Sequence, residues 1–211
     1  ACGFIEMKHH GLAVEGLWFV WSTHCRRFAA ILGILYLLLT DDTVATLYAE
    51  DVTASLSEAG FSVVTHVIPH GEASKSAVSL MDLLEIMATE HLTRSDLLVA
   101  LGGGVVGDLG GFAAAVYQRG IHFVQIPTTL LAMVDASVGG KTAIDTPEGK
   151  NLVGAFYQPS LVLCDTSTLE TLPSHIFAEG CAEVLKYGII GDIELWNALK
   201  SAPIMSQIEE I

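Results

Sequence analysis

From Leu35 onward, short aliphatic and β-branched runs alternate with longer stretches whose apolar residues fall at helical intervals. Parallel strands need a crossover of a dozen or more residues, and a helix usually supplies it. The alternation therefore predicts an α/β fold with a Rossmann-like parallel sheet. The expected strands are Leu35–Leu39, Phe61–Ile68, Leu97–Leu101, His122–Ile126 and Leu161–Cys164.

The stretches between these strands predict helices. Asp41 or Asp42 can cap the first helix, and Gly60 can end it. Residues 77–91 carry a regular amphipathic stripe, which indicates a second helix packed on the core. An Ala-rich helix is expected after the third strand. In residues 139–151 the sequence favours a Gly-rich turn and a polar loop.

The pattern divides the chain into three parts. Residues 1–34 follow no clear period, and residues 35–172 form the predicted α/β domain. Residues 173–211 begin an all-helical domain, with helices expected at about 174–187 and 193–200. The chain does not supply the elements that these last helices would pack against, so this second domain is expected to be incomplete.

Composition excludes several classes of function. Hydrophobic residues make up 51% of the chain, enough for a substantial core, and the formal charge of −14 opposes binding to nucleic acid. The apolar run Phe28–Leu39 is shorter than the roughly 20 residues of a membrane span. The four cysteines form no Cys-x-x-Cys pair. A reducing cytoplasm is therefore the expected location.

Glycines lie directly between the third expected strand and the helix that follows it. Without side chains, their backbone amides can approach a phosphate, and the helix N-terminus favours an anion. The run predicts a pyrophosphate cradle within Gly102–Asp108. Its spacing is not the Gly-x-Gly-x-x-Gly of the usual dinucleotide turn, so a tight turn without a ligand is the alternative.

Two further groups of polar residues follow strands at the same predicted edge of the sheet. Glu72 and Asp41 are candidates for ribose hydroxyls, and Lys75 is a candidate for a phosphate; an ordinary acidic first helical turn is the alternative for Glu72. Thr128 or Thr129 can cap a helix.

Lysines beside glycines suit an anionic substrate such as a phosphorylated or carboxylated sugar acid, although each residue taken alone fits an ordinary surface position. The charged and amide candidates are Asp135, Lys141, Lys150 and Asn151.

Three charged residues fall on one face of the helix expected near the C-terminus. Glu179, Glu183 and Lys186 stand at positions i, i+4 and i+7. A carboxylate in this place can ligate a metal, and the alternative is an exposed stripe with a helix ion pair. No His-x-x-x-His or His-Glu-x-x-His pattern adds further ligands.

Five ordered motifs resemble the 3-dehydroquinate synthases, a family of sugar-phosphate cyclases. The resemblance begins near Leu38 and continues to the C-terminus, whereas residues 1–34 do not match the family's opening β-hairpin. The motifs are GGGVVGDLGGFAA (Gly102–Ala114), YQRG (Tyr117–Gly120), IPTTLLAMVDASVGGKTA (Ile126–Ala143), GKNLVGAFYQP (Gly149–Pro159) and AEVLKYGII (Ala182–Ile190).

The resemblance implies a role for each matching position. It implies substrate contacts from Asp135, Lys141, Asn151 and Lys186, and a phosphate contact made by Arg119 in the neighbouring subunit of a homodimer. It implies that Glu183 is one ligand of a zinc (or cobalt) ion whose other ligands, two histidines, match no residue here. It implies that NAD is held by Asp41, Gly71, Glu72, Lys75, Gly104, Val105, Val106, Gly107, Asp108, Thr128, Thr129, Lys141, Lys150, Thr168, Leu169, Glu170 and Thr171.

The resemblance implies the cyclisation of 3-deoxy-arabino-heptulosonate 7-phosphate to 3-dehydroquinate, with loss of phosphate and regeneration of NAD+. Three alternatives stay open. The first is a sibling sugar-phosphate cyclase, against which Asn151 after Lys150 argues. The others are a glycerol-type dehydrogenase, which would release NADH stoichiometrically, and a folded NAD-binding module without catalysis.

We predict that this chain alone has little or no cyclase activity. One matching carboxylate, Glu183, cannot hold zinc in a site that needs three protein ligands. The check is an assay of phosphate release by the purified chain with zinc, NAD+ and the sugar-acid phosphate. Release at rates typical of the family would contradict the prediction.

Overall fold

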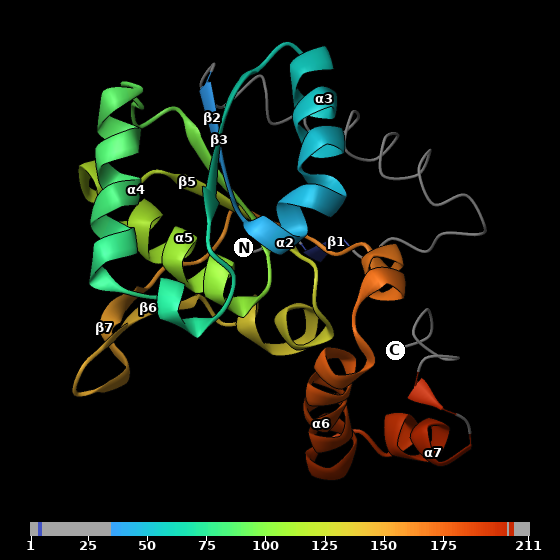
Figure 1. Cartoon of the computed structure of the whole chain (residues 1–211). Helices are drawn as coiled ribbons and strands as arrows, with labels where there is room; N and C mark the ends of the chain where they lie inside the picture. The colour runs from blue at the N-terminus through green and yellow to red at the C-terminus, as the bar shows by residue number, and fades with distance from the viewer. Residues whose placement is uncertain (1–3, 6–34, 202, 205–211) are drawn as a thin grey trace.

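The computed structural model describes residues 4–5, 35–201 and 203–204. Six strands form one sheet in the order β1-β8-β5-β4-β2-β3, and every neighbouring pair is parallel (Figure 1). The predicted α/β fold is confirmed, and the five expected strands lie within two residues of their expected ends. The strands are β1 (Phe4–Ile5), β2 (Leu35–Asp41), β3 (Ser62–Ile68), β4 (Leu97–Gly102), β5 (His122–Pro127) and β8 (Leu161–Leu163).

Helices connect the strands, as the sequence predicts. Asp41 caps the first helical stretch by accepting bonds from the backbone amides of Thr43 and Val44, both at 2.9 Å, and Gly60 follows its end with φ 95°. This stretch contains a π-helical turn, η1. The helical segments are α2 (Asp42–Val44), η1 (Ala45–Ala49), α3 (Glu50–Glu58), η2 (Glu72–Ser74), α4 (Ala77–Thr89), α5 (Gly104–Val116), η3 (Tyr117–Arg119), η4 (Ala132–Ala136), η5 (Thr166–Thr171), α6 (Ser174–Ile190) and α7 (Ile193–Ser201).

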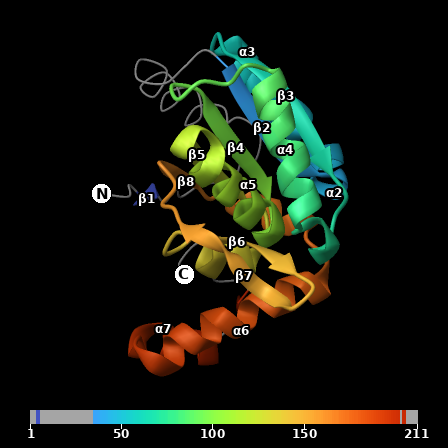
Figure 2. The same ribbon diagram turned by 90° about the vertical axis from the view of Figure 1, so that its left-hand side faces the viewer.

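The sheet is covered on both faces. Successive side chains of a strand point to opposite faces, so alternate residues of β2 belong to different cores. Leu37 and Leu39 pack with α4 and α5, whereas Tyr36 and Leu38 pack on the other face with Leu56 of α3. Figure 2 shows α4 and α5 side by side on the first face. Burial on both faces explains why the strands are almost continuously apolar.

A second, two-stranded sheet replaces the polar loop expected up to Asn151. Strands β6 (Lys141–Thr146) and β7 (Gly149–Phe156) pair antiparallel and lie below α5, between the parallel sheet and α6 (Figure 2). The loop prediction was wrong because it rested on the polar and glycine content of residues 139–151. The two runs flank Pro147-Glu148, a two-residue connection typical of a hairpin.

The last two helices lie at the carboxyl end of the sheet. Helix α6 packs on the short segment after β5 through Val184, Leu130 and Met133, with Leu169 completing this third apolar cluster. Gly180 permits the close approach, because a Cβ atom there would lie 2.7 Å from the Leu130 Cβ and the Leu131 amide nitrogen. None of the helices in the described part of the chain has the length and apolar character of a membrane span.

Candidate cofactor and substrate site

The strand order creates a crevice at the carboxyl ends of β2 and β4. β2 and β4 are neighbours, but the chain runs from β2 to β3 on one side and from β4 to β5 on the other side, so the connections after these two strands leave in opposite directions. Ligands of open α/β sheets bind at such switch points. β2 ends at Asp41 and β4 at Gly102, so two groups of candidate residues flank the crevice.

The glycine turn leaves the start of α5 open. Gly103 is the N-cap residue, and no side chain caps the helix, so its first amides are free to bind an anion. A Cβ atom on Gly102 would lie 2.7 Å from the Val106 Cγ2, and one on Gly103 would lie 3.3 Å from the Thr129 Cγ2. Larger residues would therefore block the tight path from strand to helix.

Polar atoms without partners lie beside this turn. Thr128 donates its backbone amide to the Gly102 carbonyl at 3.0 Å, but its hydroxyl is buried with no hydrogen-bond partner in the described part of the chain. The side-chain oxygen of Gln125 is also buried without a hydrogen-bond partner among the described residues. Gly107 lies close to this side chain, since a Cβ atom on Gly107 would be 2.8 Å from the Gln125 side-chain nitrogen. Buried polar atoms are nearly always bonded, so these atoms are suited to a ligand or water.

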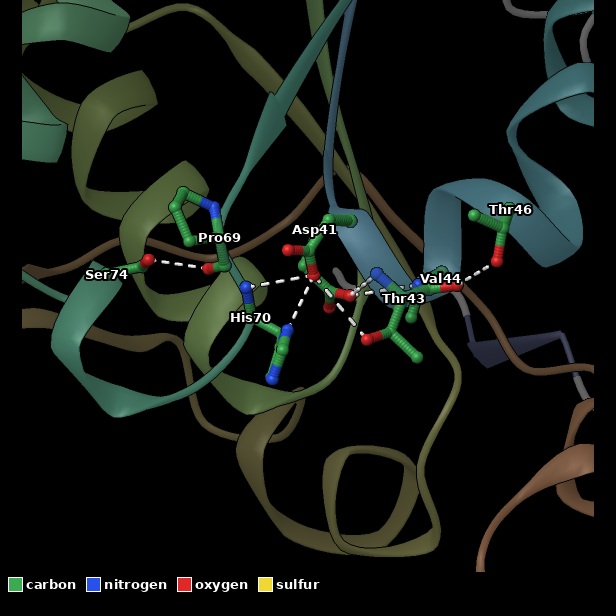
Figure 3. A network of polar contacts seen from close by, with 8 residues as sticks. Asp41, Thr43, Val44, Thr46, Pro69, His70 and Ser74 are labelled. Atoms are coloured by element: carbon green, nitrogen blue, oxygen red, sulfur yellow. Dashed lines mark hydrogen bonds and ion pairs between the residues drawn. The ribbon is translucent and has the colours of Figure 1, made fainter.

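Figure 3 shows the polar contacts where β2 and β3 end, with Asp41 at the end of β2 and His70 in the loop after β3. Asp41 is engaged as a helix cap, which is the ordinary structural role for an acid in this position. Asp42 accepts bonds from the backbone amide of His70, at 3.1 Å, and from its ring Nδ1, at 2.7 Å. The His70 hydrogen bond lowers the pKa of the Asp42 carboxyl. This contact ties the end of β3 to the start of α2.

The loop after β3 contacts the hairpin through two lysines. Lys150 donates to Glu72 at 2.9 Å, and both side chains are exposed. Lys75 is buried and forms an ion pair with Asp108. Burial raises the pKa of the Asp108 carboxyl, and the hydrogen bond and charge of Lys75 partly oppose this rise. Lys75 also donates to the Asn151 side-chain oxygen at 2.5 Å. Five residues from three separate segments of the chain are thereby brought together.

A pocket of about 420 Å³ opens between α5, η4 and the hairpin. Its polar lining comes from Asp108, Asp135, Lys141 and Asn151, which are separate in sequence. Lys141 is exposed and makes no ion pair with another described residue, so its charge is available to an anion. The pocket size lies within the range of small-molecule sites.

Helix α6 packs on η4, where the Tyr187 hydroxyl donates to the Val134 carbonyl at 3.2 Å, and it carries two charged residues of the predicted stripe. Glu183 and Lys186 form an ion pair, and the hydrogen bond to Glu183 raises the pKa of Lys186, with a smaller contribution from the charge of Asp135. The structure therefore contains the helix ion pair that was the alternative to a metal ligand at Glu183. No three His, Cys, Asp or Glu side chains gather into a metal-binding group among the described residues. Glu183 alone does not fit a three-ligand zinc site.

Three predicted residues lie apart from the glycine turn and the pocket. Thr168 and Thr171 lie in η5, where Tyr48 of η1 donates its hydroxyl toward the Thr168 carbonyl at 3.4 Å and contacts the Thr171 hydroxyl. Arg119 precedes β5 and so lies at the opposite edge of the sheet from the glycine turn. The 13 residues of α5 separate the two points by about 20 Å.

Sequence reasoning missed the apolar part of the pocket. Leu152 and Phe156 of β7 line it and are strongly exposed, at 63% and 86%. The signal was available in the two runs on either side of Pro147, whose hairpin spacing places both residues on one strand. Apolar side chains on a pocket wall exclude water from polar groups beside them.

The parallel sheet, with the glycine turn at its switch point, defines the class as an α/β domain with a Rossmann-like sheet. Residues 65–179 match the model of the family described as 3-dehydroquinate synthase N-terminal. The chain belongs to the 3-dehydroquinate synthase family.

Individual relatives agree with this assignment. A 3-dehydroquinate synthase of Picosynechococcus is 53% identical over 171 residues, which are 81% of this chain and 47% of that protein. The chain spans about half the length of the curated relatives it matches.

Solved structures give the same fold. The 2-epi-5-epi-valiolone synthase of Streptomyces hygroscopicus, which was solved with NAD+ and Zn2+ bound, superposes with a TM-score of 0.78 at 33% identity over 86% of this chain and 50% of that chain. A glycerol dehydrogenase of Schizosaccharomyces pombe has a TM-score of 0.65 at 20% identity, over 89% of this chain and 46% of that chain, and supports the fold alone.

Proposed function

We propose that this chain supplies the NAD-binding and part of the substrate-binding machinery of a 3-dehydroquinate synthase. The observation that carries the proposal is the uncapped glycine turn at the switch point, beside a pocket lined by acid, lysine and amide groups. The identities of about 50% to 3-dehydroquinate synthases, against 33% to the sibling cyclase, favour this activity within the class.

The glycine turn fits a dinucleotide. The amides of Gly104, Val105 and Val106 would meet the pyrophosphate, and Thr128 would offer its unpartnered hydroxyl. Asp41 and Glu72 would accept bonds from hydroxyls at the crevice edge. NAD+ bound there would supply a hydride acceptor for oxidation of a substrate hydroxyl. The remaining members of the proposed set are Gly71, Gly107, Asp108, Thr129, Lys141, Lys150, Thr168, Leu169, Glu170 and Thr171. Lys75 would contribute through Asp108 and Asn151, the two side chains that it contacts.

The pocket would hold the sugar-acid phosphate. Lys141 and Lys186 would meet its anionic groups, and Asn151 would donate to or accept from a hydroxyl. Asp135 would orient these lysines and would hold a substrate hydroxyl by accepting its hydrogen bond. Arg119 is exposed and follows the end of α5 opposite to the glycine turn, and this place supports a phosphate contact in a partner copy of a homodimer.

A zinc or cobalt ion is proposed for the complete site only through Glu183. The described residues do not assemble the other ligands that a closed zinc site needs.

Calorimetric titration of the purified chain with NAD+ tests the proposal. We expect saturable binding with one site per chain, since the turn and the hairpin are both present. Titration with NADP+ serves as the control for binding. In a second control the chain is incubated with NAD+, zinc and glycerol, and accumulation of NADH there would support a dehydrogenase instead. Absence of any heat of NAD+ binding in a folded sample would contradict the proposal.

A further inference from the structure

Lys75 is a buried cation that contacts two separate elements of the candidate site. Only 5% of the residue is exposed, and burying a charge is unfavourable unless it is paired. Its ammonium is paired with Asp108 of α5 and donates to the Asn151 side chain of β7 at 2.5 Å. One side chain therefore joins the helix that follows the glycine turn to the hairpin.

The backbone of Lys75 holds the same hairpin. Its carbonyl accepts the amide of Asp145 at 2.8 Å, and the Asp145 carboxylate accepts the amide of Asn151 at 2.8 Å. Asn151 has φ 58°, in the left-handed region that residues other than glycine seldom adopt. The network around Lys75 thus fixes an unusual backbone conformation at the residue whose side chain lines the pocket.

Lys75 lies behind the pocket wall. Asp108 and Asn151 both line the pocket, whereas Lys75 touches each of them and does not itself line it. An ammonium in this position acts on a ligand through the groups that it holds. Lys150 is the contrasting case, since its side chain is 71% exposed and pairs with the exposed Glu72.

We propose that Lys75 is a positioning residue that fixes Asn151 and Asp108 relative to each other and so couples the hairpin to the cofactor crevice. This inference rests on the proposed function for its effect on NAD+. The tie between the hairpin and the crevice can be measured without any ligand.

The test compares Lys75→Met, which keeps the length of the side chain, with Lys200→Met as the matched control, since Lys200 is an exposed lysine of α7 outside the proposed site. We expect amide hydrogen exchange at Asp145 and Asn151 to become about tenfold faster in Lys75→Met, and the Kd for NAD+ to rise about tenfold, because bonds to a charged group are lost. In Lys200→Met both quantities should stay within about threefold of the wild type, as expected for an exposed side chain far along the chain from the hairpin. Amides of β2 and β4 should be unchanged in both variants.

Asn151→Gly is the second variant, because glycine accepts φ 58° and loses only the side-chain acceptor. Asn151→Gly should also speed hairpin amide exchange and raise the Kd for NAD+. The double variant Lys75→Met/Asn151→Gly should differ little from Lys75→Met, because both substitutions remove the same hydrogen bond. Weaker NAD+ binding with unchanged hairpin exchange would overturn the proposal, because Lys75 would then touch the cofactor directly. A loosened hairpin with unchanged NAD+ affinity would also overturn it. If the wild type binds no NAD+, the proposed function fails. The contact between Lys75 and the hairpin is tested separately, since unchanged hairpin exchange in Lys75→Met and Asn151→Gly would refute it.

Discussion

Gly104→Asp is expected to remove most NAD+ binding while the fold stays at least as stable. Gly104 is the first residue of α5, where an acid favours the helix dipole by about 0.3–1 kcal/mol. A Cβ atom fits there, because the nearest atom, the Ala136 Cβ, is 3.4 Å away. The new carboxylate would repel a pyrophosphate about 5 Å away by about 3 kcal/mol, or roughly a hundredfold in Kd.

Gly104→Asn is the matched control, since it has the same shape without the charge. Calorimetry and thermal unfolding should be run on both variants. We expect Gly104→Asn to keep NAD+ binding within about tenfold of the wild type, because only a neutral side chain is added. Equal affinity of Gly104→Asp and the wild type would show that the anion does not bind at this helix end.

Gly154→Ala is expected to disrupt the pairing of β7 with β6 in the hairpin. The added Cβ would lie 2.7 Å from the Ala143 Cβ and 2.8 Å from its Cα, and it would overlap the Thr142 carbonyl, none of which is a flexible side-chain end. Overpacking of this kind costs about 1–3 kcal/mol, and the value here should be near the upper limit because backbone must move. The pocket would lose its β7 wall.

Hydrogen exchange of the β6 and β7 amides, together with urea unfolding, measures the effect of Gly154→Ala. Gly191→Ala is its control, since a Cβ there meets no atom within 4 Å. We expect the control to unfold as the wild type does. Slow hairpin exchange and unchanged stability in Gly154→Ala would show that β6 and β7 are not packed as described.

The parallel sheet was predictable because its strands are buried on both faces and carry no competing pattern. Leu97–Gly102 is fully buried, so its aliphatic run has one interpretation. The hairpin was not predicted because β7 is mostly exposed and keeps polar, glycine and apolar residues together. Pairing with β6, which depends on tertiary contacts, decides its conformation.

The site was predictable in its location and less so in its contacts. Carboxyl ends of parallel strands meet at one edge, so Asp41 and the glycine turn were expected together. The partners of Lys75 were not predictable, because Asp108 and Asn151 approach it from elements 33 and 76 residues away. The position of Glu183 next to Lys186 was expected from helical spacing alone.

The central claim is that the turn from β4 into α5 binds the pyrophosphate of NAD+. The most direct measurement is a titration of the isotope-labelled chain with NAD+, followed through the backbone amide resonances. The largest shifts are predicted within Gly103–Asp108, with smaller ones at Asn151 and the other pocket residues. Shifts confined to other parts of the chain, or no shifts in a folded sample, would contradict the account.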